Sequence, residues 1–170
     1  EEAVKCLEPL YKRHNNDDEM IGIMSGVYKR IWKANPDENK WLRKSNKVYE
    51  VGWMRNRQNT YLGINVAATA LLLGDKTGSQ SAADRVREIL IKRKTELERK
   101  TETQPVLLSL WDHLTLAEAE ILLGNFNTGF EIYQQTKIRF PDAIGDLNTS
   151  RDQLVLIFQH LGNKEWERKL

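Results

Sequence analysis

The chain has 170 residues, 40% of them hydrophobic, and its 26 Lys and Arg residues nearly balance 24 Asp and Glu residues, giving a net charge of +2. This length supports one well-buried core, so we expect a single domain over residues 1–170. The charge balance excludes the broad basic field typical of nucleic-acid-binding proteins. The longest largely apolar run, Val66 to Leu73, is far shorter than the ~20 residues of a membrane-spanning helix. The single cysteine, Cys6, excludes an internal disulfide framework and indicates a reducing compartment such as the cytoplasm.

Good helix formers dominate the chain, and helical periodicity recurs between short breakers. Asp17 and Asp18 can cap one helix, Gly74 and Gly124 can each end one, and Ser79 or Ser81 can start another. In chain order, we expect helices over 3–11, 17–35, 39–57, 60–73, 79 or 81 to 100, 108–123, 126–140, 148–161 and from 163 onward. The connections are short, so consecutive helices must pack as antiparallel hairpins that stack on one another.

Three tripeptides each end an apolar helix and precede a polar one: Leu72-Leu73-Gly74, Leu122-Leu123-Gly124 and His160-Leu161-Gly162. Their spacings are 50 and 38 residues. The tetratricopeptide period is about 34 residues, so that assignment requires inserted residues. For the first unit we expect about three extra residues in the turn 75–81.

The window 110–141 has the fullest repeat pattern. Ala117 is a small residue where two helices of a hairpin would approach, and Gly129, Tyr133 and Thr136 give a small-aromatic-small spacing before Pro141. This window resembles a tetratricopeptide repeat. Less complete versions of the same spacing are Ser45, Tyr49 and Gly52; Ala82, Val86 and Ile89; and, more loosely, Ala3, Leu7 and Leu10.

The repeat pattern also has gaps. In the slot where the tetratricopeptide family often has tryptophan, this chain has Gly63, His113 and Arg151. An amphipathic bundle without repeats would produce similar helix ends, and it would preserve the all-helical class. The predicted fold is all-α, with tetratricopeptide-like stacked hairpins forming a right-handed α-solenoid.

Three stretches resemble the central regulatory region of the apoptosis signal-regulating kinases and related bacterial signalling proteins: 19–30, 49–53 and 61–67. The resemblance covers about residues 18–74. It implies a region that binds tumour-necrosis-factor-receptor-associated factors, within a larger parent protein of which this chain would be a fragment. The chain has no phosphate loop or catalytic loop of the kinase type, so no phosphoryl transfer is implied.

No residues show the spacing of a catalytic or metal site. His14, His113 and His160 fall on different expected helices, and Cys6 has no histidine at a recognisable distance. We therefore expect no enzyme activity, no metal and no cofactor. The basic run at Lys92 to Lys94 is interleaved with glutamates, as on a solvated helix face.

In tetratricopeptide arrays the first helix of each hairpin lines the concave surface, so ligand contacts are expected away from the small-residue seam. The expected protein-binding residues are Tyr61, Asn65, Trp111, Glu118, Asp152 and Gln159. Trp32, Trp41 and Trp53 are expected in the core, with an exposed aromatic anchor as the alternative.

The sequence thus favours a cytoplasmic, non-catalytic regulatory scaffold of a signalling protein. Its expected partner is another protein or a peptide segment, with neither nucleic acid nor membrane, and the fragment could form a weak homodimer. The alternatives are an RNA-binding helical solenoid and a structural spacer between effector domains. An enzyme of unfamiliar type would need converging titratable groups that the sequence does not display.

Overall fold

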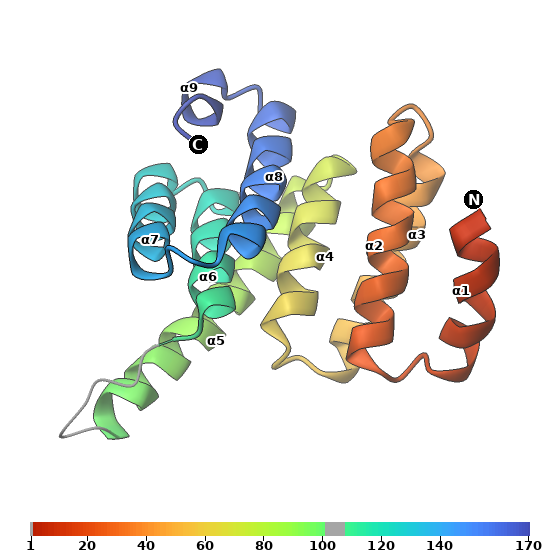
Figure 1. The fold of residues 1–170 in the computed structure, drawn as a ribbon, viewed down its shortest axis with the longest axis horizontal. Helices are drawn as coiled ribbons and strands as arrows, with labels where there is room; N and C mark the ends of the chain where they lie inside the picture. The colour runs from red at the N-terminus through yellow and green to blue at the C-terminus, as the bar shows by residue number, and fades with distance from the viewer. Residues whose placement is uncertain (1, 101–107) are drawn as a thin grey trace. The chain divides into compact units, whose positions relative to one another are not determined.

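The computed structural model describes residues 2–100 and 108–170, and every regular element in these ranges is a helix (Figure 1). The helices divide between two compact units, Glu1–Ser79 and Gln80–Leu170. Unit 1 contains α1 (Glu2–Arg13), α2 (Asp18–Ala34), α3 (Asn39–Arg55) and α4 (Thr60–Leu72). Unit 2 contains most of α5 (Lys76–Lys100), then α6 (Leu110–Leu122), α7 (Phe126–Arg139), α8 (Ile144–His160) and α9 (Lys164–Glu167).

Neighbouring helices pack as hairpins within each unit. In unit 1, α2 packs most extensively on α3, which also contacts α4; in unit 2, α6 packs most extensively on α7. Because connections of a few residues reverse the chain, these neighbours are antiparallel. The predicted all-helical class and its packed hairpins are therefore confirmed. The prediction of one domain over residues 1–170 stays a prediction.

Three glycines end helices in the same way. Gly74, Gly124 and Gly162 have positive φ angles of 86°, 89° and 66°, a conformation that costs other residues steric strain. In each turn the glycine N–H and the following N–H bond to carbonyls of the last helical turn; for example, Asn125 N donates to Glu120 O at 2.9 Å. The predicted helix ends at these glycines are confirmed.

The predicted insertion in the turn 75–81 is wrong. Helix α5 starts at Lys76, because the Asp75 carboxylate accepts a hydrogen bond from Gly78 N at 2.8 Å and so caps the helix directly after the glycine turn. The residues that stand at the same distances from the turn as Gly129, Tyr133 and Thr136 are therefore Ser79, Ala83 and Val86, all fully buried. They replace the set Ala82, Val86 and Ile89.

The spacing of 50 residues between Gly74 and Gly124 is partly explained by the length of α5. Helix α5 has 25 residues, whereas α7 has 14. Helix α8 likewise has 17 residues against 13 in α6, because it starts at Ile144, one turn before the predicted Asn148. The polar residue Thr149 is accommodated within the first turns of α8, since its hydroxyl donates to Gly145 O one turn earlier at 2.9 Å. Helix α6 starts two residues later than predicted, after the Ser109 cap.

Small residues allow the helices of each hairpin to approach closely. The Ser45 hydroxyl of α3 donates to Ser25 O of α2 at 2.9 Å, and a Cβ on Gly52 would lie 2.8 Å from Ile21 Cδ1. In the α6–α7 hairpin, Gly129 lies against the Ala117 carbonyl. The residues predicted for these two seams therefore occupy them. By contrast, Val4 is the one buried residue of α1, so the looser set Ala3, Leu7 and Leu10 forms no comparable seam.

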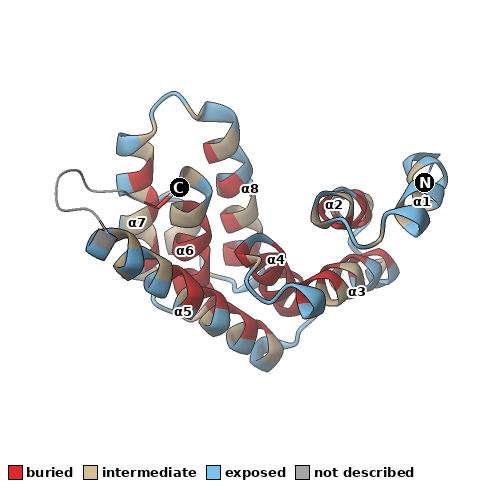
Figure 2. Ribbon diagram, turned by 90° about the horizontal axis from the view of Figure 1, so that it is seen from below, coloured by how far each residue is buried: buried red, intermediate tan, exposed pale blue. Residues whose placement is uncertain are grey.

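Aromatic side chains fill the space beside the small residues. Tyr49 and Tyr133 are each 1% exposed, and the Tyr133 hydroxyl donates to Leu147 O at 3.3 Å, which fastens α7 to α8. Trp32, Trp41 and Trp53 are buried, as predicted for core residues. Figure 2 shows the contrast between the largely buried α6 and the largely exposed α1.

We expect Gly129→Ala to lower the free energy of unfolding by about 1–3 kcal/mol, the usual cost of overpacking. The new Cβ would lie 2.6 Å from Ile121 Cγ1 and 2.7 Å from the Ala117 carbonyl oxygen, which belongs to the backbone and cannot move aside. The matched control is Gly145→Ala in α8, where no atom lies within 4 Å. Urea denaturation of both variants checks this; equal stability would contradict the close approach.

Candidate functional site

The six predicted protein-binding residues divide between the two units. Tyr61 and Asn65 lie on α4 in unit 1, whereas Trp111 and Glu118 on α6 and Asp152 and Gln159 on α8 lie in unit 2. We describe the two groups separately as the Tyr61 surface and the Trp111 surface.

Tyr61 is the exposed aromatic residue of an otherwise buried helix. Every other residue from Thr60 to Leu72 is buried, whereas Tyr61 is 47% exposed. Its ring crosses α2, because a Cβ on Gly22 would lie 3.0 Å from Tyr61 Cε1 and 3.1 Å from the hydroxyl oxygen. It also meets the buried Tyr49 edge to face, with ring centroids 6.4 Å apart. The contacts with α2 and Tyr49 therefore hold the Tyr61 ring in place, and the rest of the ring remains accessible.

Asn65 is buried beside Tyr61 and positions a cation. It is 9% exposed; its amide nitrogen donates to Tyr61 O at 2.9 Å, and its amide oxygen accepts from Lys29 Nζ at 3.3 Å. The Lys29 ammonium of α2 is thereby held close to the first turns of α4. Asn65 thus contributes to the surface by orienting Lys29 more than by offering its own amide.

Gly22, Gly26 and Lys29 follow one face of α2 at helical spacing, and they complete the Tyr61 surface together with Tyr61 and Asn65. A Cβ on Gly26 would meet no atom within 4 Å, so open space lies beside the α2 backbone at this point. Sequence reasoning missed this contribution from α2. The i, i+4, i+7 arrangement of two glycines and a lysine was the available signal.

The Trp111 surface has a similar make-up on α6 and α8. Trp111 is 46% exposed, whereas Glu118, two turns along α6, is 8% exposed and accepts from the Gln153 amide of α8 at 3.1 Å. Asp152 and Gln159 are exposed on α8, and the Gln159 amide donates to Glu167 of α9 at 2.7 Å. Trp111 and Glu118 on α6 therefore correspond to Tyr61 and Asn65 on α4. In each pair the aromatic ring is accessible and the polar residue is buried and hydrogen-bonded to a neighbouring helix.

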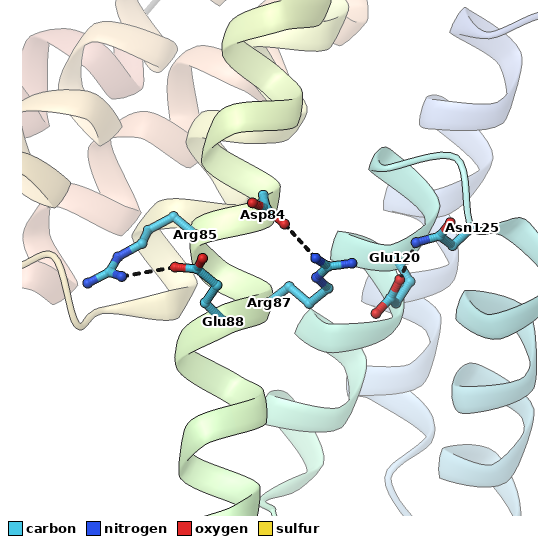
Figure 3. A network of polar contacts seen from close by, with 6 residues as sticks. All are labelled: Asp84, Arg85, Arg87, Glu88, Glu120 and Asn125. Atoms are coloured by element: carbon cyan, nitrogen blue, oxygen red, sulfur yellow. Dashed lines mark hydrogen bonds and ion pairs between the residues drawn. The ribbon is translucent and has the colours of Figure 1, made fainter.

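A second polar cluster in unit 2 has a structural role. Figure 3 shows Arg87 extending from α5 toward α6, where Glu120 lies. Arg87 pairs with Asp84 of its own helix at 2.7 Å, and the Glu120 carboxylate accepts from the Asn125 amide at 2.7 Å across the glycine turn. Since Asn125 also bonds Glu120 through its backbone, this contact fixes the α6–α7 turn.

Catalytic and metal-binding groups do not gather in the described residues. No group of three or more His, Cys, Asp or Glu side chains there could hold a metal ion. Within the same residues, no helix combines the length and apolar character that a membrane crossing needs. The basic run of α5 includes two pairs with glutamates at helical spacing, Lys92–Glu96 at 3.9 Å and Lys94–Glu98 at 4.0 Å, all with exposed side chains.

Comparison with known proteins supports a repeat domain in the first part of the chain. Residues 1–73, less than half of the chain, match the family model described as Tetratricopeptide Repeats-Sensor. Searches of curated proteins and of solved structures gave no match. The matched residues contain the α2–α3 hairpin and the Tyr61 surface. Repeats of the tetratricopeptide type generally mediate protein–protein interaction, so the comparison agrees with a role in protein binding.

We expect a double-mutant cycle of Lys29→Ala and Asn65→Ala to give a coupling energy of about 0.5–1.5 kcal/mol, the usual net value of a partly buried hydrogen bond. The pair joins α2 to α4, so each single variant already loses the contact and the two losses should not add. Urea denaturation of the four proteins measures the coupling. Additive losses would show that Asn65 does not hold Lys29 in solution.

Proposed function

We propose that the chain is a non-catalytic regulatory scaffold of a cytoplasmic signalling protein and that unit 1 binds a peptide segment of another protein at the Tyr61 surface. The proposal rests on two features of this surface. Tyr61 is exposed while its ring packs on α2, and Lys29 is held by Asn65 on the same helix as Gly26, beside which there is open space. A fixed aromatic ring supplies contact area at low entropic cost, as at the energetic centres of protein interfaces. No cofactor is required.

The chemistry of the Tyr61 surface favours an acidic segment with an apolar side chain. An apolar residue of the segment would pack on the accessible side of Tyr61, where the opposite side is supported by Gly22. A carboxylate one turn away would reach Lys29, and the open space at Gly26 would let the segment approach the α2 backbone. The Trp111 surface would provide a second contact in unit 2, through Trp111 and the exposed Asp152.

The rival functions differ in what they require of these surfaces. An RNA-binding solenoid needs a continuous row of cations, whereas Lys92 and Lys94 each lie within ion-pairing distance of a glutamate one turn along α5. A spacer needs no binding surface. A weak homodimer could form through α1, where Leu10 is 44% exposed.

We expect Tyr61→Ala to weaken capture of the partner from source-cell lysate by about tenfold or more, as for other aromatic anchors. Trp111→Ala tests the second surface in the same way. Each has a control at an exposed apolar residue on a neighbouring helix of the same unit: Met54→Ala on α3, 61% exposed, and Ile138→Ala on α7, 81% exposed. Circular dichroism first confirms equal helicity, and quantitative mass spectrometry compares the captured proteins.

The charge of the segment is tested at Gly26. Gly26→Glu and Gly26→Lys add side chains of similar length into the same open space, so they share any steric effect. An acidic segment should bind more weakly to Gly26→Glu than to Gly26→Lys. A partner retained equally by Tyr61→Ala, Trp111→Ala and the controls would overturn the assignment and favour the spacer.

A further inference from the structure

Unit 2 contains a cavity of about 460 Å³ between α5, α6 and α7, and its described lining includes none of the residues that define the Trp111 surface. Such a volume is typical of sites for small molecules. We refer to it as the α5–α7 cavity.

The inner lining of the α5–α7 cavity is apolar. Leu108 and Leu116 are 3% and 8% exposed, and the half-buried Ile132 lines it from α7. The hydroxyl of Thr136, also in the lining, donates to Ile132 O at 2.7 Å within its own helix. This part of the cavity therefore suits an aliphatic or aromatic body.

The outer lining of the cavity is cationic. Lys94 from α5 and Arg139 from α7, both exposed, line the cavity, and none of the described lining residues is a carboxylate. Lys94 Nζ lies 4.0 Å from Glu98 Oε1, and Arg139 lies over the Phe140 ring at 5.8 Å. Two positive groups on different helices thus converge where an anion would be favoured.

His113 places an unused hydrogen-bonding group in the same lining. Its Nε2 atom is buried and has no hydrogen-bond partner among the described residues. Leaving such a group unpaired costs free energy, which a ligand would recover. Burial, together with Arg139 and Lys94, lowers the pKa of the imidazole, while Asp112 acts in the opposite direction. Asp112 is itself paired with Arg93, at 2.5 Å.

We propose that the α5–α7 cavity binds a small organic carboxylate, with its charge near Lys94 and Arg139 and its apolar body on the inner lining. His113 also lines the cavity, and a turn of its side chain would bring the buried Nε2 atom to a carboxylate oxygen. A singly charged group suits this cavity better than a phosphate dianion, because Leu108, Leu116 and Ile132 in the lining offer no hydrogen bonds to replace the hydration of a doubly charged group. The proposal does not depend on the protein-binding function.

Ligand binding would couple to protonation of His113. The bound carboxylate favours the charged imidazolium, so the pKa of His113 should be higher in the complex than in the free protein. Affinity should therefore rise as pH falls through the imidazole pKa of the complex, until the pH is low enough to protonate the carboxylate of the ligand. Among the described residues, the charged groups that act on His113 are Arg139, Lys94 and Asp112.

The test uses the whole chain and titrates acetate, octanoate, 4-phenylbutyrate, uncharged 4-phenylbutanamide and inorganic phosphate by calorimetry, with His113 followed by imidazole NMR. We expect saturable binding of octanoate or 4-phenylbutyrate, with the amide and phosphate about tenfold weaker or more. Arg139→Gln and Lys94→Gln should weaken carboxylate binding severalfold. Lys92→Gln, on the same helix but 80% exposed and outside the lining, should leave it unchanged.

Several results would overturn the proposal. These are no saturable binding of any carboxylate, equal binding of acid and amide, equal binding of phosphate, or equal losses in Lys92→Gln and Lys94→Gln. A ligand-induced decrease in the His113 pKa would also contradict the assigned position of the carboxylate.

Discussion

The close approach of paired helices is the constraint on which the rest of this structure depends. At Gly129 the neighbouring backbone oxygen would lie 2.7 Å from any added Cβ, and at Ser45 a hydroxyl bonds directly to Ser25 O across the seam. Helices this close leave no room for large side chains along the seam. The large residues must therefore lie beside it, which is where the fully buried Tyr49 and Tyr133 are found.

This arrangement also determines which residues remain available for binding. On α4 and the middle of α6 nearly every position is buried, so a side chain that stays exposed there is an exception. Tyr61, 47% exposed in the first turn of α4, is such an exception, whereas Trp111, 46% exposed, lies in the first turn of α6 just before its buried part. Their backbone belongs to well-packed helices, and a rigid support lowers the entropy lost when a partner binds.

The sequence predicted the helix-ending glycines and the hairpin seams because their causes are local. A positive φ favours glycine at Gly74 and Gly124 wherever the rest of the chain lies, and small-aromatic-small spacing follows from helical geometry. The predicted start of α5 at Ser79 or Ser81 is wrong, because Asp75, directly after the glycine, caps the helix. Several residues after Gly74 can cap a helix. The correct one is the residue that directly follows the glycine turn, because the turn ends at Gly74.

The candidate sites were less predictable because they depend on contacts between helices. Tyr61 and Trp111 followed from the repeat pattern, but the burial of Asn65 and Glu118 depends on Lys29 and Gln153, which are distant in sequence. The sequence spacing of His113 indicates no site, and its sequence neighbours give no reason to combine it with Lys94 and Arg139. Those three groups meet only because α5, α6 and α7 bring them to one cavity. Among the described residues the imidazole Nε2 has no partner, and two cations line the same cavity; this arrangement is unfavourable for folding alone, and the proposed carboxylate would relieve it.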